Sequence, residues 1–93
     1  MHWTTLVEAK ELGASLGQAD LAIIDCRFDL RDPGSGARAF AAGHIPGAVY
    51  AHLDEDLSDL TRTGLGRHPL PSHDAFCARL AAMGVSPTHQ VVC

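Results

Sequence analysis

The hydrophobic positions along this chain change their spacing from segment to segment, and these changes predict alternating strands and helices. A short apolar and β-branched run predicts a strand at Thr4–Val7, and apolar positions at helical spacing predict a helix over Glu8–Leu16. Leu21–Asp25 is a continuous apolar run that ends in a carboxylate. Such a run is typical of a parallel strand covered on both faces.

A polar, turn-rich segment follows and leads into a second helix. Arg27–Gly36 contains Asp-Pro-Gly-Ser-Gly, which is the strongest loop signal in the chain. Ser35 or Gly36 can cap a short helix over Ala37–Ala42. The alternation of strand, helix and strand therefore continues beyond this loop.

One histidine lies at the corner after this helix. We expect Gly43 to end the helix in the left-handed conformation, and Pro46-Gly47 to turn the chain into a strand near Ala48–Ala51. His44 stands between these rigid residues, so its side chain should be held in one orientation. Two roles stay open for it: a ring nitrogen that fixes the turn, or a group that faces a cleft. Either role would be pH-sensitive, because imidazole titrates near neutral pH.

The last part of the chain predicts a long connection, a helix and a strand. Leu53–Pro71 is first acidic and then basic, and connections of this length are usually functional or wrap a neighbour. Ser72–Met83 predicts a helix with Ser72 as its N-cap and Gly84 after its end. Its apolar stripe consists of Phe76, Leu80 and Met83. Gln90–Cys93 predicts the opening of a fourth buried strand, and we expect the chain to end within it.

Length and charge suit one soluble domain. The 93 residues are 46% hydrophobic and 19% charged, which allows a modest core. The net charge is -4 and the seven Lys and Arg residues do not cluster, so we expect no nucleic-acid partner. The N-terminus has no secretory pattern and no stretch is long enough to cross a bilayer, so we expect no membrane partner.

The cysteines and histidines indicate a reducing compartment and no metal. Cys26, Cys77 and Cys93 form an odd set without Cys-x-x-Cys spacing, so the chain is expected in the cytoplasm with free thiols. We expect all three to pack in the core or at its boundary. Two alternatives stay open: a catalytic role for Cys93 and redox sensitivity for Cys26. Together with the histidines they fit no zinc-finger spacing, so we expect no metal and no cofactor.

Two stretches of the chain resemble the rhodanese family of sulfurtransferases. Ile23–Arg27 is similar to the family's aspartate-x-arginine strand end, and Gly43–Ala48 is similar to its histidine-centred first signature. Ala51 is smaller than the apolar residue that relatives often carry there. Leu53–Asp59 and the segments after it resemble the N-terminal half of the two-domain thiosulfate or 3-mercaptopyruvate sulfurtransferases.

The resemblance implies an α/β fold: a rhodanese-like three-layer α/β/α arrangement around a parallel sheet with strand order 3-2-4-5-1. Residues 1–93 would then be an incomplete N-terminal rhodanese-like domain, truncated after the fourth strand. Without the fifth strand, Thr4–Val7 would lack a hydrogen-bonding neighbour, and the fourth strand would expose an edge. We therefore expect the isolated chain to be marginally folded at best.

The resemblance also implies a reaction. A sulfane sulfur moves from thiosulfate or 3-mercaptopyruvate onto a cysteine, as a persulfide, and then to a thiol or cyanide acceptor. The cysteine loop of such domains follows the fourth strand, so no catalytic residue is expected within this chain, which should be inactive alone. Its partners would be a C-terminal rhodanese domain of the same protein and a small anionic sulfur donor. A non-catalytic rhodanese module for binding or regulation is the alternative. A cysteine phosphatase would need a cysteine loop closed by an arginine, and no such loop is present.

Site residues follow from the same resemblance. His44 would face the cleft between the two halves, with Asp32 or Asp29 as its carboxylate partner. Arg27 would face substrate or the second domain, or form a structural pair with Asp25. The remaining signature residues, Gly43, Pro46 and Gly47, are expected to be structural. Two arginines of the long connection, Arg62 and Arg67, could attract an anionic donor. A solvated position in the loop is favoured for both.

Overall fold

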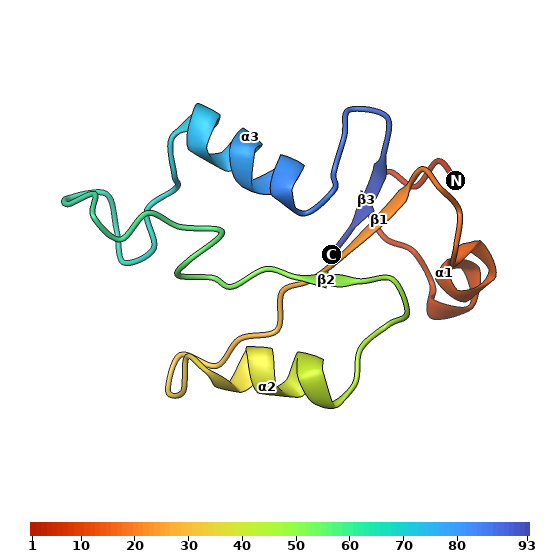
Figure 1. Cartoon of the computed structure of the whole chain (residues 1–93), viewed down its shortest axis with the longest axis horizontal. Coiled ribbons are helices and arrows are strands. Elements are labelled where there is room, and N and C mark those ends of the chain that lie inside the picture. Colours follow the sequence, from red (N-terminus) through yellow and green to blue (C-terminus); the bar gives the residue numbers. More distant parts are fainter.

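Three parallel strands form the centre of the computed structural model, which describes all 93 residues. The elements in chain order are α1 (Ala9–Ser15), β1 (Leu21–Asp25), α2 (Ser35–Ala42), β2 (Val49–Tyr50), α3 (His73–Ala82) and β3 (Gln90–Val92). The strands lie in the order β2-β1-β3, and β2 runs between α3 and α2 (Figure 1). These strands are the expected third, second and fourth ones, so this part of the predicted sheet order is confirmed.

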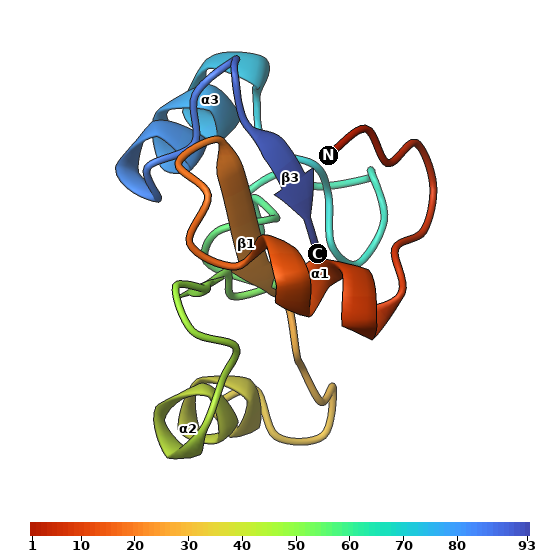
Figure 2. The same cartoon turned by 90° about the vertical axis from the view of Figure 1, so that its right-hand side faces the viewer.

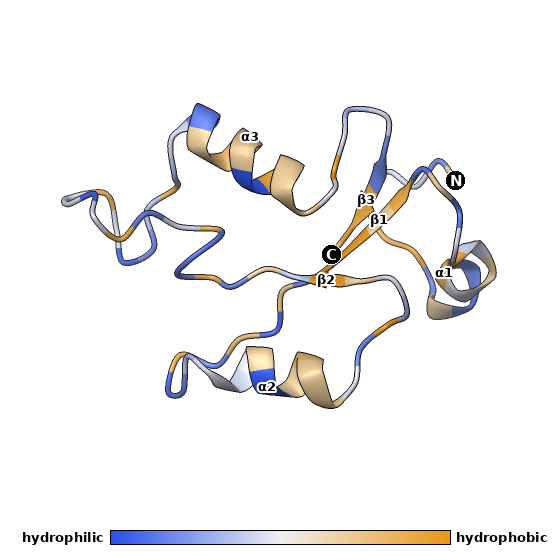
Figure 3. Cartoon of the chain, viewed as in Figure 1, coloured by the Kyte–Doolittle hydropathy of each residue, from blue (hydrophilic) through white to orange (hydrophobic).

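The central position of β1 in the sheet explains why Leu21–Asp25 is a continuous apolar run. The strand pairs with β2 through Ile24 opposite Val49, and with β3 through Ile23 opposite Val92. A strand with neighbours on both sides presents both of its faces to covering elements. Figure 3 shows that β1 is coloured as hydrophobic along most of its length. The buried apolar side chains are few: Ile23, Ile24, Ala48 and Ala51.

The prediction of an N-terminal strand is wrong. Thr4–Val7 is irregular and pairs with no strand, and β3 pairs only with β1. A groove of about 360 Å³ separates residues 3–7 from β3, and Figure 2 shows the segment curving past β3 without joining the sheet. A β-branched run forms a strand only where a neighbour completes its hydrogen-bond ladder, and none lies within reach here.

The second helix and its end differ from expectation in two details. The helix begins at Ser35, with Gly34 at the N-cap position and no side-chain cap. Gly43 is not left-handed: its φ is 178°, which is extended backbone, and its N–H still donates to the carbonyl of Ala39. The left-handed residue is Gly47, at φ +84°, because the turn with Pro46 requires a positive φ there.

The third helix is the one that local signals describe best. The Ser72 hydroxyl accepts a hydrogen bond from the Ala75 N–H at 3.2 Å, as an N-cap should. Gly84 has φ +86°, and the Val85 N–H donates to the Leu80 carbonyl at 3.0 Å, which closes the helix end. The helix has ten residues, and none of the helices could span a bilayer.

The long connection between β2 and α3 contains no helix or strand. Figure 1 shows it reaching away from the sheet before it returns to α3. The Asp59 N–H donates to the Pro69 carbonyl at 2.8 Å and closes the base of this excursion. Three of its leucines are exposed: Leu60, Leu65 and Leu70.

Candidate functional site

A cavity of about 740 Å³ lies where the carboxyl ends of β1 and β3 meet the corner between α2 and β2. Ligands of open parallel α/β sheets gather at this edge. Most of the lining is apolar. Its chemically active side chains are Asp25, Cys26, Arg27, His44 and Cys93.

Arg27 links the end of β1 to the residue before the histidine. Its Nε and Nη2 atoms lie 3.0 and 2.8 Å from Oδ2 of Asp25, and Nη2 also donates to the Gly43 carbonyl at 2.8 Å. This hydrogen-bonded pair holds the pKa of Asp25 below its usual value, and the positive charge of a protonated His44 adds a smaller effect in the same direction. The strand end and the histidine corner are therefore one connected unit.

His44 is oriented by the last turn of α2. Its Nδ1 lies 2.7 Å from the Phe40 carbonyl, and its ring stacks on the Phe40 ring with centroids 3.7 Å apart. A carbonyl only accepts, so Nδ1 carries the hydrogen and Nε2 of the neutral ring keeps a free lone pair. The ring is exposed and borders the cavity. At Nε2 it can accept a proton from a bound molecule, or return one to it.

The two loop carboxylates expected beside His44 have other partners. Asp32 pairs with Arg38 and accepts the Gly34 N–H, and Asp29 pairs with Arg31 at 3.2 Å. Neither carboxylate borders the cavity. The structure therefore brings Arg27 and His44 together and leaves Asp32 apart from them, because nearby arginines hold both loop carboxylates.

The prediction that all three cysteines are packed away is wrong, because each is exposed. Cys26 and Cys93 border the same cavity, and Cys77 lies on α3 with its sulfur 3.8 Å from Nε2 of His73. Local burial of the sulfur raises the pKa of Cys26, and Cys93 adds to the effect. Sequence reasoning missed this proximity. The only signal in the sequence was that Cys26 directly follows one predicted strand and Cys93 is the last residue of another.

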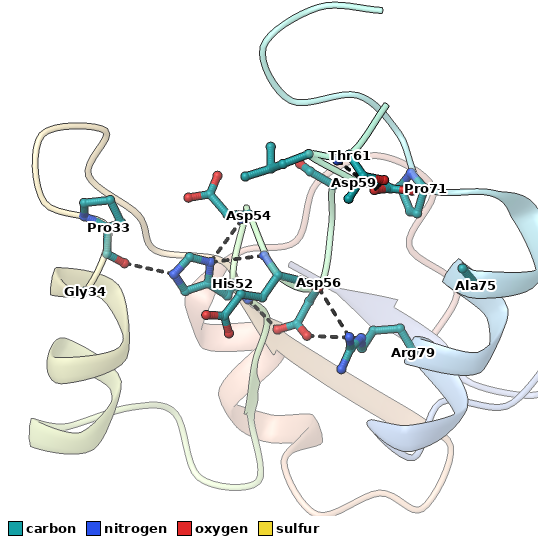
Figure 4. Close-up of a pocket in the computed structure, with 13 residues that line it drawn as sticks. Pro33, Gly34, His52, Asp54, Asp56, Asp59, Thr61, Pro71, Ala75 and Arg79 are labelled. Carbon is teal, nitrogen blue, oxygen red and sulfur yellow. Dashed lines mark hydrogen bonds and ion pairs between the residues drawn. The ribbon is translucent and has the colours of Figure 1, made fainter. Parts of the chain in front are cut away.

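A second cavity, of about 770 Å³, lies between α3, the Pro33 loop and the connection after β2 (Figure 4). Four carboxylates border it: Asp54, Glu55, Asp56 and Asp59. Arg79 is the one basic side chain that borders it, and it pairs with Asp56 at 3.3 Å. This charge does not suit an anionic sulfur donor. Arg62, which could have attracted such a donor, instead donates to the Leu70 carbonyl at 2.7 Å.

His52 holds this second region together, a role that the sequence did not indicate. Its Nδ1 accepts the N–H groups of Asp54 and Glu55 at 3.0 and 3.3 Å, so Nε2 carries the hydrogen and donates to the Pro33 carbonyl at 3.0 Å (Figure 4). The ring therefore connects the start of the long connection to the loop before α2. No local pattern could have revealed a contact between residues so far apart.

A parallel sheet in this order, with an aspartate-x-arginine strand end beside a histidine corner, defines a rhodanese-like domain. The sequence profile of the rhodanese-like domain matches residues 8–92. The chain belongs to the rhodanese family. The predicted fold class and family resemblance are thereby confirmed.

The similar proteins are named sulfurtransferases. The chain is 47% identical, over 99% of its length, to a probable 3-mercaptopyruvate sulfurtransferase of Pseudomonas aeruginosa, and covers 33% of that protein. It is 33% identical, over 94% of its length, to thiosulfate/3-mercaptopyruvate sulfurtransferase 2 of Arabidopsis thaliana, and covers 25% of it. The structure of a 3-mercaptopyruvate sulfurtransferase from Leishmania major matches 94% of this chain with a TM-score of 0.83 and 32% identity; 24% of that chain is covered. The chain thus spans a third or less of these relatives.

Proposed function

We propose that this chain forms the N-terminal rhodanese-like domain of a two-domain sulfurtransferase. The protein would move a sulfane sulfur from thiosulfate or 3-mercaptopyruvate to a thiol or cyanide. The observation that carries the proposal is the 47% identity, along nearly the whole chain, to one third of a protein named as a 3-mercaptopyruvate sulfurtransferase. Three free thiols fit a reducing cytoplasm as its location.

The persulfide-bearing cysteine lies outside these 93 residues in this proposal. A sulfur-transfer cysteine must be a thiolate at neutral pH, and helix N-termini or neighbouring cations provide that by lowering its pKa. Cys26 has the opposite property, because partial burial of its sulfur raises its pKa. Cys77 lies inside α3, where the helix backbone N–H groups are already hydrogen-bonded. The environments of Cys26 and Cys77 therefore favour neither of them as the sulfur-transfer nucleophile.

His44 and Arg27 form one wall of the active-site cleft in this proposal. The Arg27 side chain is 49% exposed, so its guanidinium can attract an anionic donor while Asp25 fixes its position. The free Nε2 of His44 can move a proton at the donor. Asp25 and Gly43 act through these two groups and hold their geometry.

The second domain and the rest of the sheet complete the fold in this proposal. The outer edge of β3 has no partner strand, and the groove beside it could receive the fifth strand that the family resemblance implies. Exposed leucines such as Leu6, at 89%, and Leu70, at 76%, would be covered by the same remainder of the protein. The small core supports this, because four buried apolar side chains are few for an independent domain.

The test is a cyanide-coupled sulfur-transfer assay on the full-length protein with thiosulfate and with 3-mercaptopyruvate. We expect thiocyanate from at least one donor, and a persulfide on a cysteine outside residues 1–93 by mass spectrometry. The absence of both products would instead support a non-catalytic rhodanese module.

The role of His44 is tested in the same assay. His44→Ala should lower kcat/KM by about 10²-fold, the lower range for loss of a proton-transferring group. His73→Ala is the matched control, because His73 is 90% exposed on α3 and does not border the cavity. Wild-type turnover in His44→Ala would leave the histidine with only its structural role.

A further inference from the structure

Two thiols from distant parts of the sequence border one cavity at the carboxyl edge of the sheet. Ile23 lies opposite Val92, so a continuation of this parallel register by one residue would place Cys93 beside Ile24. Cys26 comes two residues after Ile24. Alternate residues of an extended segment point to the same face, so this continuation would place both thiols on the same side of the sheet edge.

The cavity supports this proximity. Cys26 and Cys93 both border it, whereas Cys77 does not. Figures 1 and 2 agree that the C end of the chain lies beside the carboxyl end of β1. The Cys26 sulfur lies 3.8 Å from the Ile24 carbonyl, near the carboxyl end of β1. Cys93 is near enough to influence the ionisation of the Cys26 thiol.

We propose that Cys26 and Cys93 form a reversible disulfide that joins the ends of β1 and β3 when the protein meets a small disulfide such as oxidised glutathione. The inference goes beyond the proposed function, because it needs no sulfur donor and no second domain. It assigns the two thiols a role as a redox-sensitive modification site. A disulfide of this kind in a reducing compartment is transient, as expected for a sensing pair.

The exchange proceeds in two balanced steps. The thiolate of Cys93 attacks one sulfur of the small disulfide, forms a mixed disulfide and releases one small thiol. The thiolate of Cys26 then attacks the Cys93 sulfur and releases the second small thiol. The protein loses two electrons and two protons, and both appear in the two released thiols. We assign the first attack to Cys93, because partial burial of the Cys26 sulfur limits its access to a small disulfide.

The bond would change the opening of the candidate site. It would fasten the end of β3 to the residue before Arg27, which holds the Gly43 carbonyl beside His44. Because both cysteines border the cavity, a disulfide between them would limit how far the ends of β1 and β3 can move apart. Oxidation would therefore restrict access to the wall that contains Arg27 and His44.

Tryptic mapping of the full-length protein tests the proposal directly. The three cysteines fall in three different peptides: residues 11–27, residues 68–79 and the peptide that begins at Leu80. The protein is incubated with oxidised glutathione, free thiols are alkylated, and the digest is analysed without reduction. We expect peptide 11–27 linked to the peptide that begins at Leu80, and loss of this species on treatment with dithiothreitol.

Variants separate the two steps. Cys77→Ser should keep the linked species, whereas Cys26→Ser should stop the exchange with glutathione attached to Cys93. The wild-type map decides the question even if a variant folds poorly. Free Cys26 beside glutathionylated Cys93 in the wild-type protein would overturn the proposal, as would linkage of either residue to a different cysteine. Neither result bears on sulfur transfer, which the thiocyanate assay measures separately.

Discussion

Gly36 is the position where the structure predicts the sharpest effect of a single methyl group. It is buried in the first turn of α2. A Cβ built there would lie 2.0 Å from the Arg27 carbonyl oxygen and 2.2 Å from the Tyr50 hydroxyl, far below the 3.4 Å at which ordinary contact begins. These two atoms are joined by a hydrogen bond of 2.8 Å. Gly36→Ala must therefore push α2 away from the end of β1.

Three contributions determine the change in folding free energy that Gly36→Ala causes. Loss of the hydrogen bond between Tyr50 and the Arg27 carbonyl costs about 1 kcal/mol. Overpacking against a backbone atom that cannot rotate away costs about 1–3 kcal/mol. Alanine regains at most about 1 kcal/mol of helix propensity over glycine. We expect Gly36→Ala to destabilise the region around α2 and β2 by about 1–3 kcal/mol.

Gly13→Ala is the matched control, because Gly13 lies in α1 and a Cβ there meets nothing within 4 Å. It should stabilise α1 by about 0.5–1 kcal/mol. Native-state hydrogen exchange of the full-length protein measures both effects. Amides of α2 and β2 should exchange roughly 5- to 150-fold faster in Gly36→Ala, as 1.4 kcal/mol corresponds to tenfold. Unchanged or slower exchange there would refute the close packing of α2 against Arg27.

Three further predictions concern the helix cap, the ion pair and the core. Ser72→Ala should speed amide hydrogen exchange in the first turn of α3 by the equivalent of about 1 kcal/mol, because it removes the acceptor for the Ala75 N–H. Ser72→Asp should restore protection, and equal exchange in all three proteins would contradict the role of Ser72 as the N-cap. Arg27 lowers the pKa of Asp25, so this carboxylate stabilises the fold fully above its ordinary pKa near 4, and the contribution is lost as pH falls through the lower folded value. Asp25→Asn should therefore reduce folding stability at pH 7 and weaken the dependence of stability on pH below about pH 4, measured in acid titrations followed by circular dichroism. An unchanged pH dependence below about pH 4 would exclude this role of Asp25. Ile24→Ala should destabilise the sheet by about 2–5 kcal/mol in urea titrations, and a loss below about 1 kcal/mol would show that the small core does not depend on this residue.

Local interactions explain which elements could be predicted from the sequence. Leu21–Asp25 was predicted with the bounds that β1 has, because a continuous apolar run between polar segments has few other stable arrangements. The α3 helix followed from Ser72 and Gly84, whose hydrogen bonds reach only a few residues along the chain. The turn at Pro46-Gly47 is equally local.

In the candidate site, too, local features could be predicted and long-range contacts could not. Arg27 and His44 were recognisable from their signatures, but the hydrogen bond from Arg27 to the Gly43 carbonyl joins positions 16 residues apart. The carboxylates Asp29 and Asp32 were expected at His44, and arginines close in sequence hold them elsewhere. A spacing pattern cannot tell which of several nearby cations a carboxylate will choose.

The family, the parallel α/β layout and the histidine corner could be recognised from the amino-acid sequence, because each depends on short runs of residues. The other features arise from contacts between distant segments. In the folded chain, Thr4–Val7 has no strand partner and Gly43 has an extended backbone. His52 connects to the Pro33 loop, and Cys26 and Cys93 border one cavity. These features depend on which distant segments become neighbours, and only the folded chain establishes that.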